Sequence, residues 1–233
     1  MAVVRCVLFA VGPALFWLWI YYRRDRWEPE PKAMVLRLFL LGMLAALPAW
    51  WIERALAPSA AGWAGGLVFD NFVRVALVEE GCKFLVVWLF AYYHREFDEP
   101  MDGIVYAVAC ALGFATVENV FYGLMLGEKV ILYRAFTSTL AHVAFSGIIG
   151  YELGRAKFRG PEGRLKVWFA FWLAVVLHGF YDTLLGFAGR GGSWEFIARG
   201  GLLLVLPLAL GLLALAVRRA DRASPFRPQQ SPM

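Results

Sequence analysis

Ionisable side chains interrupt four of the most apolar stretches of the chain. Charged groups are costly at membrane depth, and where they occur they usually belong to a functional site. Carboxylates and imidazoles are also the groups that transfer protons in hydrolysis and that bind zinc. In chain order, the candidate residues are Glu79, Glu80, Lys83, Glu118, Asn119, His142, His178 and Asp182.

The spacing of these residues predicts which side chains share a helix face. Residues four apart lie on one face, so Lys83 is expected beside Glu79, and Asp182 beside His178. Glu80 points about 100° away from Glu79, yet it lies three residues before Lys83. One glutamate can therefore pair with the lysine while the other faces a cavity, and Asp182 can orient His178 or bind the same substrate oxygen.

Two kinds of hydrolytic site are compatible with this set. In the first, Glu79 or Glu80 is a general base that activates water, while histidine, asparagine or aspartate side chains polarise the carbonyl group. In the second, Glu118, His142 and His178 hold a zinc ion that keeps an open position for water, and Glu79 or Glu80 is the base. The sequence leaves both sites open.

The composition predicts the environment in which these residues work. Of the 233 residues, 61% are hydrophobic and 18% are charged, whereas a soluble domain has about 25% charged residues. A chain of this length cannot bury so much apolar surface from water. The composition therefore excludes a disordered chain, a coiled coil and a disulfide scaffold, and it predicts an all-α, polytopic membrane helical bundle.

Seven stretches are long enough and apolar enough to cross a membrane as helices of about 20 residues. The gaps between them are too short for a soluble domain. Residues 1–220 are therefore expected to form a single transmembrane helical-bundle domain, followed by a disordered cytoplasmic tail over residues 221–233. The expected spans are 3–22, 33–52, 67–93, 102–126, 130–153, 167–188 and 196–217.

Lysine and arginine are distributed unequally between alternate loops. The loops at residues 23–32, 95, 155–166 and 218–227 carry fourteen of them, and the opposite set carries five. Because cytoplasmic loops are enriched in Lys and Arg, the first set is expected in the cytoplasm, with the N-terminus outside and the C-terminus inside. This topology accounts for the net charge of +5 without nucleic acid as a partner.

The same topology predicts that the candidate residues lie at one depth. Glu79 lies about 12 residues into its span, roughly 18 Å along a helix axis, and Glu118, His142 and His178 lie at comparable positions in theirs. A single site near the membrane midplane is therefore expected. Arg134, near the outer end of its expected span, is interpreted as an interfacial residue.

In their order along the chain, these motifs resemble the PrsW family of intramembrane proteases, which is related to the CAAX-prenyl proteases and bacteriocin-processing membrane proteases. The resemblance rests on E-E-x-x-K at 79–83, F-x-x-x-E-N at 114–119, a membrane histidine at His142 and H-x-x-x-D at 178–182. Residues 25–31 also resemble the family's Asp-Arg-x-Glu-Pro-Glu-Pro stretch.

The resemblance implies hydrolysis of a peptide bond in a membrane-anchored protein. In the best-known role of the family, that protein is an anti-sigma factor cut on the outer side of the membrane. The implied partners are the substrate protein and the lipid bilayer. The predicted spans indicate a multi-pass protein of the cell membrane, and the short loops and single compact set of spans suit a bacterial inner membrane. The implied catalytic residues, with Lys83 and Asn119 in support, are Glu79, Glu80, Glu118, His142, His178 and Asp182.

The family has been described both as glutamic-type and as metallo-type. By comparison with the CAAX group, Glu79 would activate water and Lys83 would anchor a glutamate. A glutamic-type site needs no cofactor, whereas a metallo-type site needs one zinc ion. The two carboxylates that adjoin Lys83 favour the glutamic type, because they are suited to hold a charged base.

Two further functions are compatible with buried acid–base groups. A proton-coupled transporter also uses buried Glu, His and Asp side chains as proton relays, but no inverted repeat is visible in this sequence. A non-catalytic membrane receptor or scaffold would use the cavity to hold a partner helix.

Overall fold

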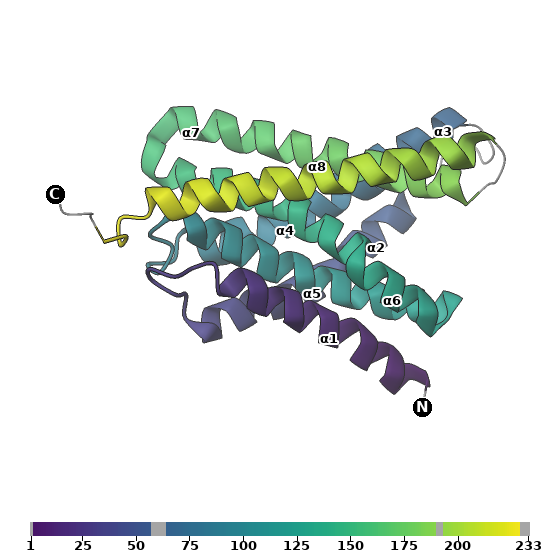
Figure 1. Ribbon diagram of the computed structural model, residues 1–233, viewed down its shortest axis with the longest axis horizontal. Helices are drawn as coiled ribbons and strands as arrows, with labels where there is room; N and C mark the ends of the chain where they lie inside the picture. Colours follow the sequence, from purple (N-terminus) through teal and green to yellow (C-terminus); the bar gives the residue numbers. More distant parts are fainter. Residues whose placement is uncertain (1, 57–63, 190–192, 229–233) are drawn as a thin grey trace.

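Helices make up almost all of the computed structural model, which describes residues 2–56, 64–189 and 193–228, and these ranges contain no strand. The helices run mainly along the long axis of the molecule, joined by short links (Figure 1). Large apolar side chains face outward, among them Leu203 at 75% exposed and Phe169 at 73%. An apolar exterior of this kind suits lipid, and the predicted all-α membrane bundle is confirmed.

Five helical segments are long and apolar enough to cross a membrane. Four of them belong to α1 (Ala2–Tyr22), α2 (Lys32–Ala55), α5 (Pro100–Leu126) and α8 (Ser193–Ala223). The fifth is the second limb of α7 (Ser138–Ala188), over Glu162–Ala188. These segments overlap five of the seven predicted spans.

The α7 helix is two limbs that meet at Gly160. This residue has φ 60° and ψ −144°, in the left-handed region that favours glycine. The chain reverses there, and the two green limbs lie side by side in Figure 1. A Cβ on Gly163 would meet the Cα of Ala156 at 2.6 Å, so the limbs approach closely just beyond the turn.

The third predicted span, 67–93, is a helical path with two wide turns. It consists of α3 (Ala64–Phe69), η1 (Asp70–Ala76), α4 (Leu77–Val87) and η2 (Trp88–Tyr92), which follow one another without a break. The η segments are π-helical, a geometry often found at functional sites. This path carries both glutamates of the E-E-x-x-K motif.

The fifth predicted span, 130–153, is wrong as a single helix. The α6 helix (Glu128–Phe136) ends at Thr137, whose φ of −122° and ψ of −83° are not helical, and α7 begins at Ser138. Hydroxyl side chains compete with the backbone for hydrogen bonds, and Thr137 Oγ1 donates to the carbonyl of Tyr133 at 3.0 Å. The break matters because it determines where Arg134 points.

The α5 helix is the buried centre of the bundle, and small residues let its neighbours approach closely. A Cβ added to Gly103 would lie 2.1 Å from the carbonyl oxygen of Gly150 in α7. A Cβ on Gly113 would lie 1.9 Å from the carbonyl oxygen of Phe39 in α2. These backbone contacts fix the positions of α2 and α7 relative to α5, and thus the walls of the site.

The four loops that were expected in the cytoplasm lie together at one end of the bundle. Arg26 pairs with Asp221 at 2.9 Å, and Lys157 Nζ donates to the carbonyl of His94 at 3.1 Å. The chain begins at one end of the molecule and leaves α8 at the other (Figure 1). We call this loop-bearing end, defined by residues 23–31, 94–99, 155–160 and 218–224, the basic end.

The first residues of the predicted disordered tail are helical in the structure. The α8 helix continues to Ala223, past the expected tail boundary at residue 221, and Ser224 is buried. Residues 229–233, the last part of the predicted tail, lie outside the described residues.

Candidate active site

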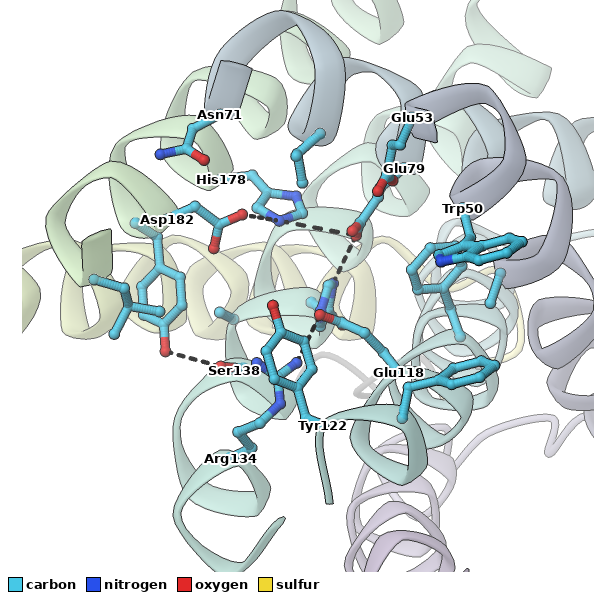
Figure 2. Close-up of a pocket in the computed structure, with 18 of the residues that line it drawn as sticks. Trp50, Glu53, Asn71, Glu79, Glu118, Tyr122, Arg134, Ser138, His178 and Asp182 are labelled. Atoms are coloured by element: carbon cyan, nitrogen blue, oxygen red, sulfur yellow. Dashed lines mark hydrogen bonds and ion pairs between the residues drawn. The ribbon is translucent and has the colours of Figure 1, made fainter. Parts of the chain in front are cut away.

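A cavity of about 490 Å³ lies among α2, η1, α4, α5, α6 and α7. Its polar walls face one another in Figure 2, with carboxylates, histidines and an arginine drawn from separate helices. The cavity brings together five of the six residues that the sequence predicted as catalytic. These are Glu79, Glu118, His142, His178 and Asp182.

The sixth residue, Glu80, lies behind the cavity wall and is fully buried. Its Oε1 accepts from Lys83 Nζ at 2.7 Å and lies 3.0 Å from His178 Nδ1. Its Oε2 accepts from Ser146 Oγ at 3.0 Å. Both carboxylate oxygens are therefore committed to neighbours, so Glu80 holds the lysine and the histidine in place.

Glu79 is the glutamate that faces the cavity. Its Oε2 lies 3.4 Å from Lys83 Nζ, 3.8 Å from His142 Nδ1 and 3.9 Å from His178 Nε2. These separations exceed the 2.7–3.2 Å of an ordinary N–H···O hydrogen bond. The Glu79 carboxylate is thus less tightly committed than that of Glu80, although both pair with the same lysine as the spacing predicted.

Lys83 is the central cation of the cluster, with 1% of its surface exposed. Besides the two glutamates, its Nζ lies 3.0 Å from His142 Nδ1 and 4.6 Å from the centre of the Phe114 ring. A buried charge is tolerated when it is paired and hydrogen-bonded. Two carboxylates, an imidazole and an aromatic face supply that compensation.

His142 is held between a cation and an anion. Its Nε2 lies 2.8 Å from Glu118 Oε2, while Nδ1 faces Lys83. Because an ammonium group can only donate, Nδ1 accepts the hydrogen bond from a charged lysine. The ring hydrogen then sits on Nε2 and is donated to Glu118.

His178 faces a carboxylate at each ring nitrogen. Its Nδ1 lies 3.0 Å from Glu80 Oε1, and its Nε2 lies 3.3 Å from Asp182 Oδ2. The predicted contact between His178 and Asp182, four residues apart, is therefore confirmed (Figure 2). Phe145 stacks on the ring, with centroids 5.3 Å apart and planes inclined by 26°, and limits its rotation.

Arg134 belongs to this site, and its interpretation as an interfacial residue is wrong. It is 8% exposed, pairs with Glu118 Oε1 at 2.8 Å and donates from Nε to Asn119 Oδ1 at 2.7 Å. Asn119 in turn donates to Thr139 Oγ1 at 2.9 Å. An arginine inside an apolar run was the signal available in the sequence, but the prediction of one helix over 130–153 missed the break at Thr137 that separates Arg134 from α7.

Two other polar residues in the cavity wall were not predicted from the sequence. Glu53, at the end of α2, is half-buried, and Asn71, in η1, donates to Thr183 Oγ1 at 3.2 Å. Both are labelled in Figure 2 on the side of the cavity that holds His178 and Glu79. Asn71 lies eight residues before Glu79, and Glu53 lies on α2, a helix that carries none of the motifs, so spacing alone gave no sign of them.

The site also contains a donor set that fits zinc. One oxygen of Glu79 and one nitrogen each of His142 and His178 all lie within 4.8 Å of one another, and all three residues are buried. Two imidazoles and a carboxylate are a common zinc set. The set expected from sequence had Glu118 in place of Glu79, whereas in the structure Glu118 contacts the outer nitrogen of His142, as partners of ligating histidines do.

Comparisons with known proteins agree with these observations. The model of the "PrsW family intramembrane metalloprotease" family matches residues 30–213. Protease PrsW of Geobacillus kaustophilus is 39% identical over 95% of this chain and 94% of its own. Protease PrsW of Bacillus subtilis is 36% identical over 75% of this chain and 80% of its own, and no solved structure matches.

Proposed function

Because the chain belongs to the PrsW family of intramembrane proteases, we propose that the cavity hydrolyses a peptide bond of a membrane-anchored protein with Glu79 as the base. The observation that carries this proposal is the position of Glu79, whose Oε2 faces the cavity between His142 and His178. The homologous proteases do not favour a proton-coupled transporter.

In the proposed reaction, Glu79 takes a proton from a water molecule as the water oxygen bonds to the carbonyl carbon. The electron pair of the C=O bond moves to oxygen. The Nε2–H group of His178, which faces Asp182 Oδ2 at 3.3 Å before the reaction, then shifts its hydrogen bond from Asp182 to that oxyanion. When the tetrahedral intermediate collapses, Glu79 returns the proton to the amide nitrogen. The C–N bond then breaks and releases a carboxyl and an amino end.

The buried partners position these groups before the reaction starts. Lys83 lies 3.4 Å from Glu79, and Glu80 fixes both Lys83 and the Nδ1 side of His178. The chain of contacts from Arg134 through Glu118 to His142 fixes the other imidazole. Groups preorganised in a site that excludes most water stabilise developing charge more strongly than in water.

Zinc, if it binds, would be held by Glu79, His142 and His178 and would supply a polarised carbonyl and a more acidic water. We favour Glu79 as a base that works without the metal, as the sequence indicated. The reason is that Lys83 Nζ lies 3.0 Å from His142 Nδ1 and 3.4 Å from Glu79 Oε2. A second cation at these atoms would be repelled by the ammonium group.

The shape of the cavity supports a cut toward the outer side of the membrane. From the catalytic residues it extends along Trp50 and Glu53 at the end of α2, Met125 at the end of α5 and Gly186 near the end of α7. Those helix ends lie opposite the basic end. We propose a multi-pass position in a bacterial inner membrane with the basic end in the cytoplasm, and an anti-sigma factor as a candidate substrate.

The test is cleavage of a single-span protein substrate by the purified chain in liposomes. We expect wild-type protein to produce two fragments, with mass spectrometry placing the cut in the outer half of the span. Glu79→Gln and His178→Ala are expected to cleave at least about a hundredfold more slowly, while Glu152→Gln, which alters an ion pair with Arg155, retains activity. No cleavage by wild-type protein, or equal cleavage by Glu79→Gln, would overturn the proposal.

Metal content measured on the same samples tests the choice of mechanism. We expect full wild-type activity after zinc has been removed with a chelator. Loss of bound zinc together with activity, and recovery of both when zinc is restored, would instead assign Glu79, His142 and His178 to the metal.

A further inference from the structure

The segment at residues 25–31, which resembles the Asp-Arg-x-Glu-Pro-Glu-Pro stretch, takes no part in the cavity. It links α1 to α2 at the basic end and packs against the start of α5 (Figure 1). Two of its acidic side chains are buried there with two from the start of α5. We call these four residues the acidic cluster: Asp25 at 3% exposed, Glu30 at 2%, Glu99 at 1% and Asp102 at 0%.

One oxygen on each of three of these carboxylates is fixed by the protein. Asp25 Oδ2 accepts from the backbone N–H of Glu30 at 3.1 Å, and Glu30 Oε2 accepts from the Tyr106 hydroxyl. Asp102 Oδ2 accepts from the backbone N–H of Glu99 at 2.6 Å as part of the capping box of α5. Each of these three carboxylates is therefore oriented by a donor that binds one of its two oxygens.

The second oxygens of the acidic cluster have no donor. In the part of the chain that the structure describes, Asp25 Oδ1, Glu30 Oε1, Glu99 Oε2 and Asp102 Oδ1 are buried and accept no hydrogen bond. One oxygen each of Asp25, Glu30 and Asp102 lie within 4.8 Å of one another. The Asp25 carboxyl also faces that of Glu99, and the Glu30 carboxyl faces that of Asp102, at hydrogen-bonding range.

Ionised carboxylates cannot donate to each other, so such contacts need a proton or a cation between them. The nearby basic side chains have other partners. Arg26 pairs with Asp221, and Lys157 donates to the backbone carbonyl oxygens of His94 and Phe97. The protein thus orients four acidic groups toward one another and supplies no cation from those two side chains.

We propose that Asp25, Glu30 and Asp102, with Glu99 beside them, bind one hard divalent cation of the Ca²⁺ or Mg²⁺ class. An all-oxygen donor set selects these ions over zinc, which prefers nitrogen and sulfur. Two oxygens on opposite sides of Ca²⁺ lie about 4.6–5.2 Å apart, since each bond measures about 2.3–2.6 Å. The three oxygens lie within 4.8 Å of one another, which is close enough for them to share one such ion.

The bound cation joins the α1–α2 link to α5. Asp25 and Glu30 belong to the link, whereas Asp102 and Glu99 lie at the start of α5, the helix that carries Glu118 farther along. Because the ion would bind the folded arrangement and not the separated chain segments, it stabilises the folded state by mass action. The site is separate from the donor set at Glu79, which contains two imidazoles.

Thermal unfolding of the full-length chain in detergent tests this site, with tryptophan fluorescence as the signal. After treatment with a chelator, we expect millimolar Ca²⁺ or Mg²⁺ to raise the Tm of wild-type protein by about 5 °C or more. The double variant Asp25→Asn/Glu30→Gln is expected to lose this shift. Glu28→Gln removes a carboxylate from the same segment that is not one of the four in the acidic cluster, and it is expected to keep the shift.

A second measurement covers the case in which the double variant does not fold. Electron paramagnetic resonance of Mn²⁺ added to metal-free wild-type protein is expected to show one bound ion, displaced by Ca²⁺. Glu79→Gln should bind the same amount, because its carboxylate belongs to the other donor set. No bound ion and no Tm shift in wild-type protein would mean that the carboxyls share protons instead, and it would overturn the proposal, as would an equal shift in the double variant.

Discussion

Two clusters of buried carboxylates lie at different heights of the same bundle, and their negative charge is compensated in different ways. Around the cavity, Glu79 and Glu80 share the ammonium group of Lys83, and Glu118 pairs with Arg134. At the basic end, the acidic cluster contains four carboxylates, and burial together with neighbouring negative charge raises the pKa of Asp25 to about 8 and that of Glu30 to about 10.

The difference shows what each cluster is suited to do. Internal cations compensate the buried carboxylates of the cavity without an external ion. Among the residues that the structure describes, no Lys or Arg forms an ion pair with the acidic cluster, so the stability of this cluster depends on the protons or cations that it takes up from solution. Removing one charged residue should therefore have opposite effects on stability in the two places.

The largest expected effect comes from removing the central cation. Lys83→Met leaves Glu79 and Glu80 buried without their shared partner, which costs about 3–5 kcal/mol in the free energy of unfolding. We expect much lower yields of folded protein and a lower denaturant midpoint, with Lys83→Arg retaining part of the stability. An unchanged midpoint for Lys83→Met would mean that the lysine does not balance the cluster.

Removing Arg134 should affect the reaction more than the fold. Arg134→Gln removes the guanidinium group that pairs with Glu118 and donates to Asn119, so His142 is less firmly oriented. Loss of such an outer partner lowers activity by about 10–100-fold. Cleavage rates for Arg134→Gln and Arg134→Lys, compared at equal amounts of folded protein, check this, and a wild-type rate in Arg134→Gln would contradict it.

The smallest expected effect has the opposite sign. In the presence of a chelator, the carboxyls of the acidic cluster must share protons or repel one another, and Asp25→Asn/Glu30→Gln relieves this crowding, which stabilises the fold by about 1–2 kcal/mol. Denaturant unfolding in chelator measures this against wild-type protein and Glu28→Gln. A large destabilisation would show that the acidic cluster is already balanced without a metal.

Helix periodicity predicted much of the cavity and little of the acidic cluster. The i, i+4 spacing predicted Lys83 beside Glu79 and Asp182 beside His178. Counting residues into each span predicted that the candidate residues of four helices lie at one depth. Which glutamate faces the cavity was open, because that depends on Ser146 and His178, which arrive from α7 to bind Glu80.

Two features were not predicted from the sequence, namely the break between α6 and α7 and the long-range contacts that form the acidic cluster. The Thr-Ser-Thr run at 137–139 ends α6, and without that break Arg134 was interpreted as interfacial. The acidic cluster joins a loop to a helix start 70 or so positions later, a contact that no periodicity contains. The resemblance at residues 25–31 identified the segment but not the role of its carboxylates.

We propose that Glu79 acts as the base in the reaction, whereas Glu80 holds Lys83 and His178 in place and so stabilises the fold. Cleavage rate and Tm measured side by side for Glu79→Gln and Glu80→Gln test it most directly. We predict that Glu79→Gln loses about 10²–10⁴-fold in rate with a Tm near that of wild type, whereas Glu80→Gln lowers the Tm clearly and keeps measurable cleavage at low temperature. The reverse pattern, with an active Glu79→Gln and a stable, inactive Glu80→Gln, would contradict the account.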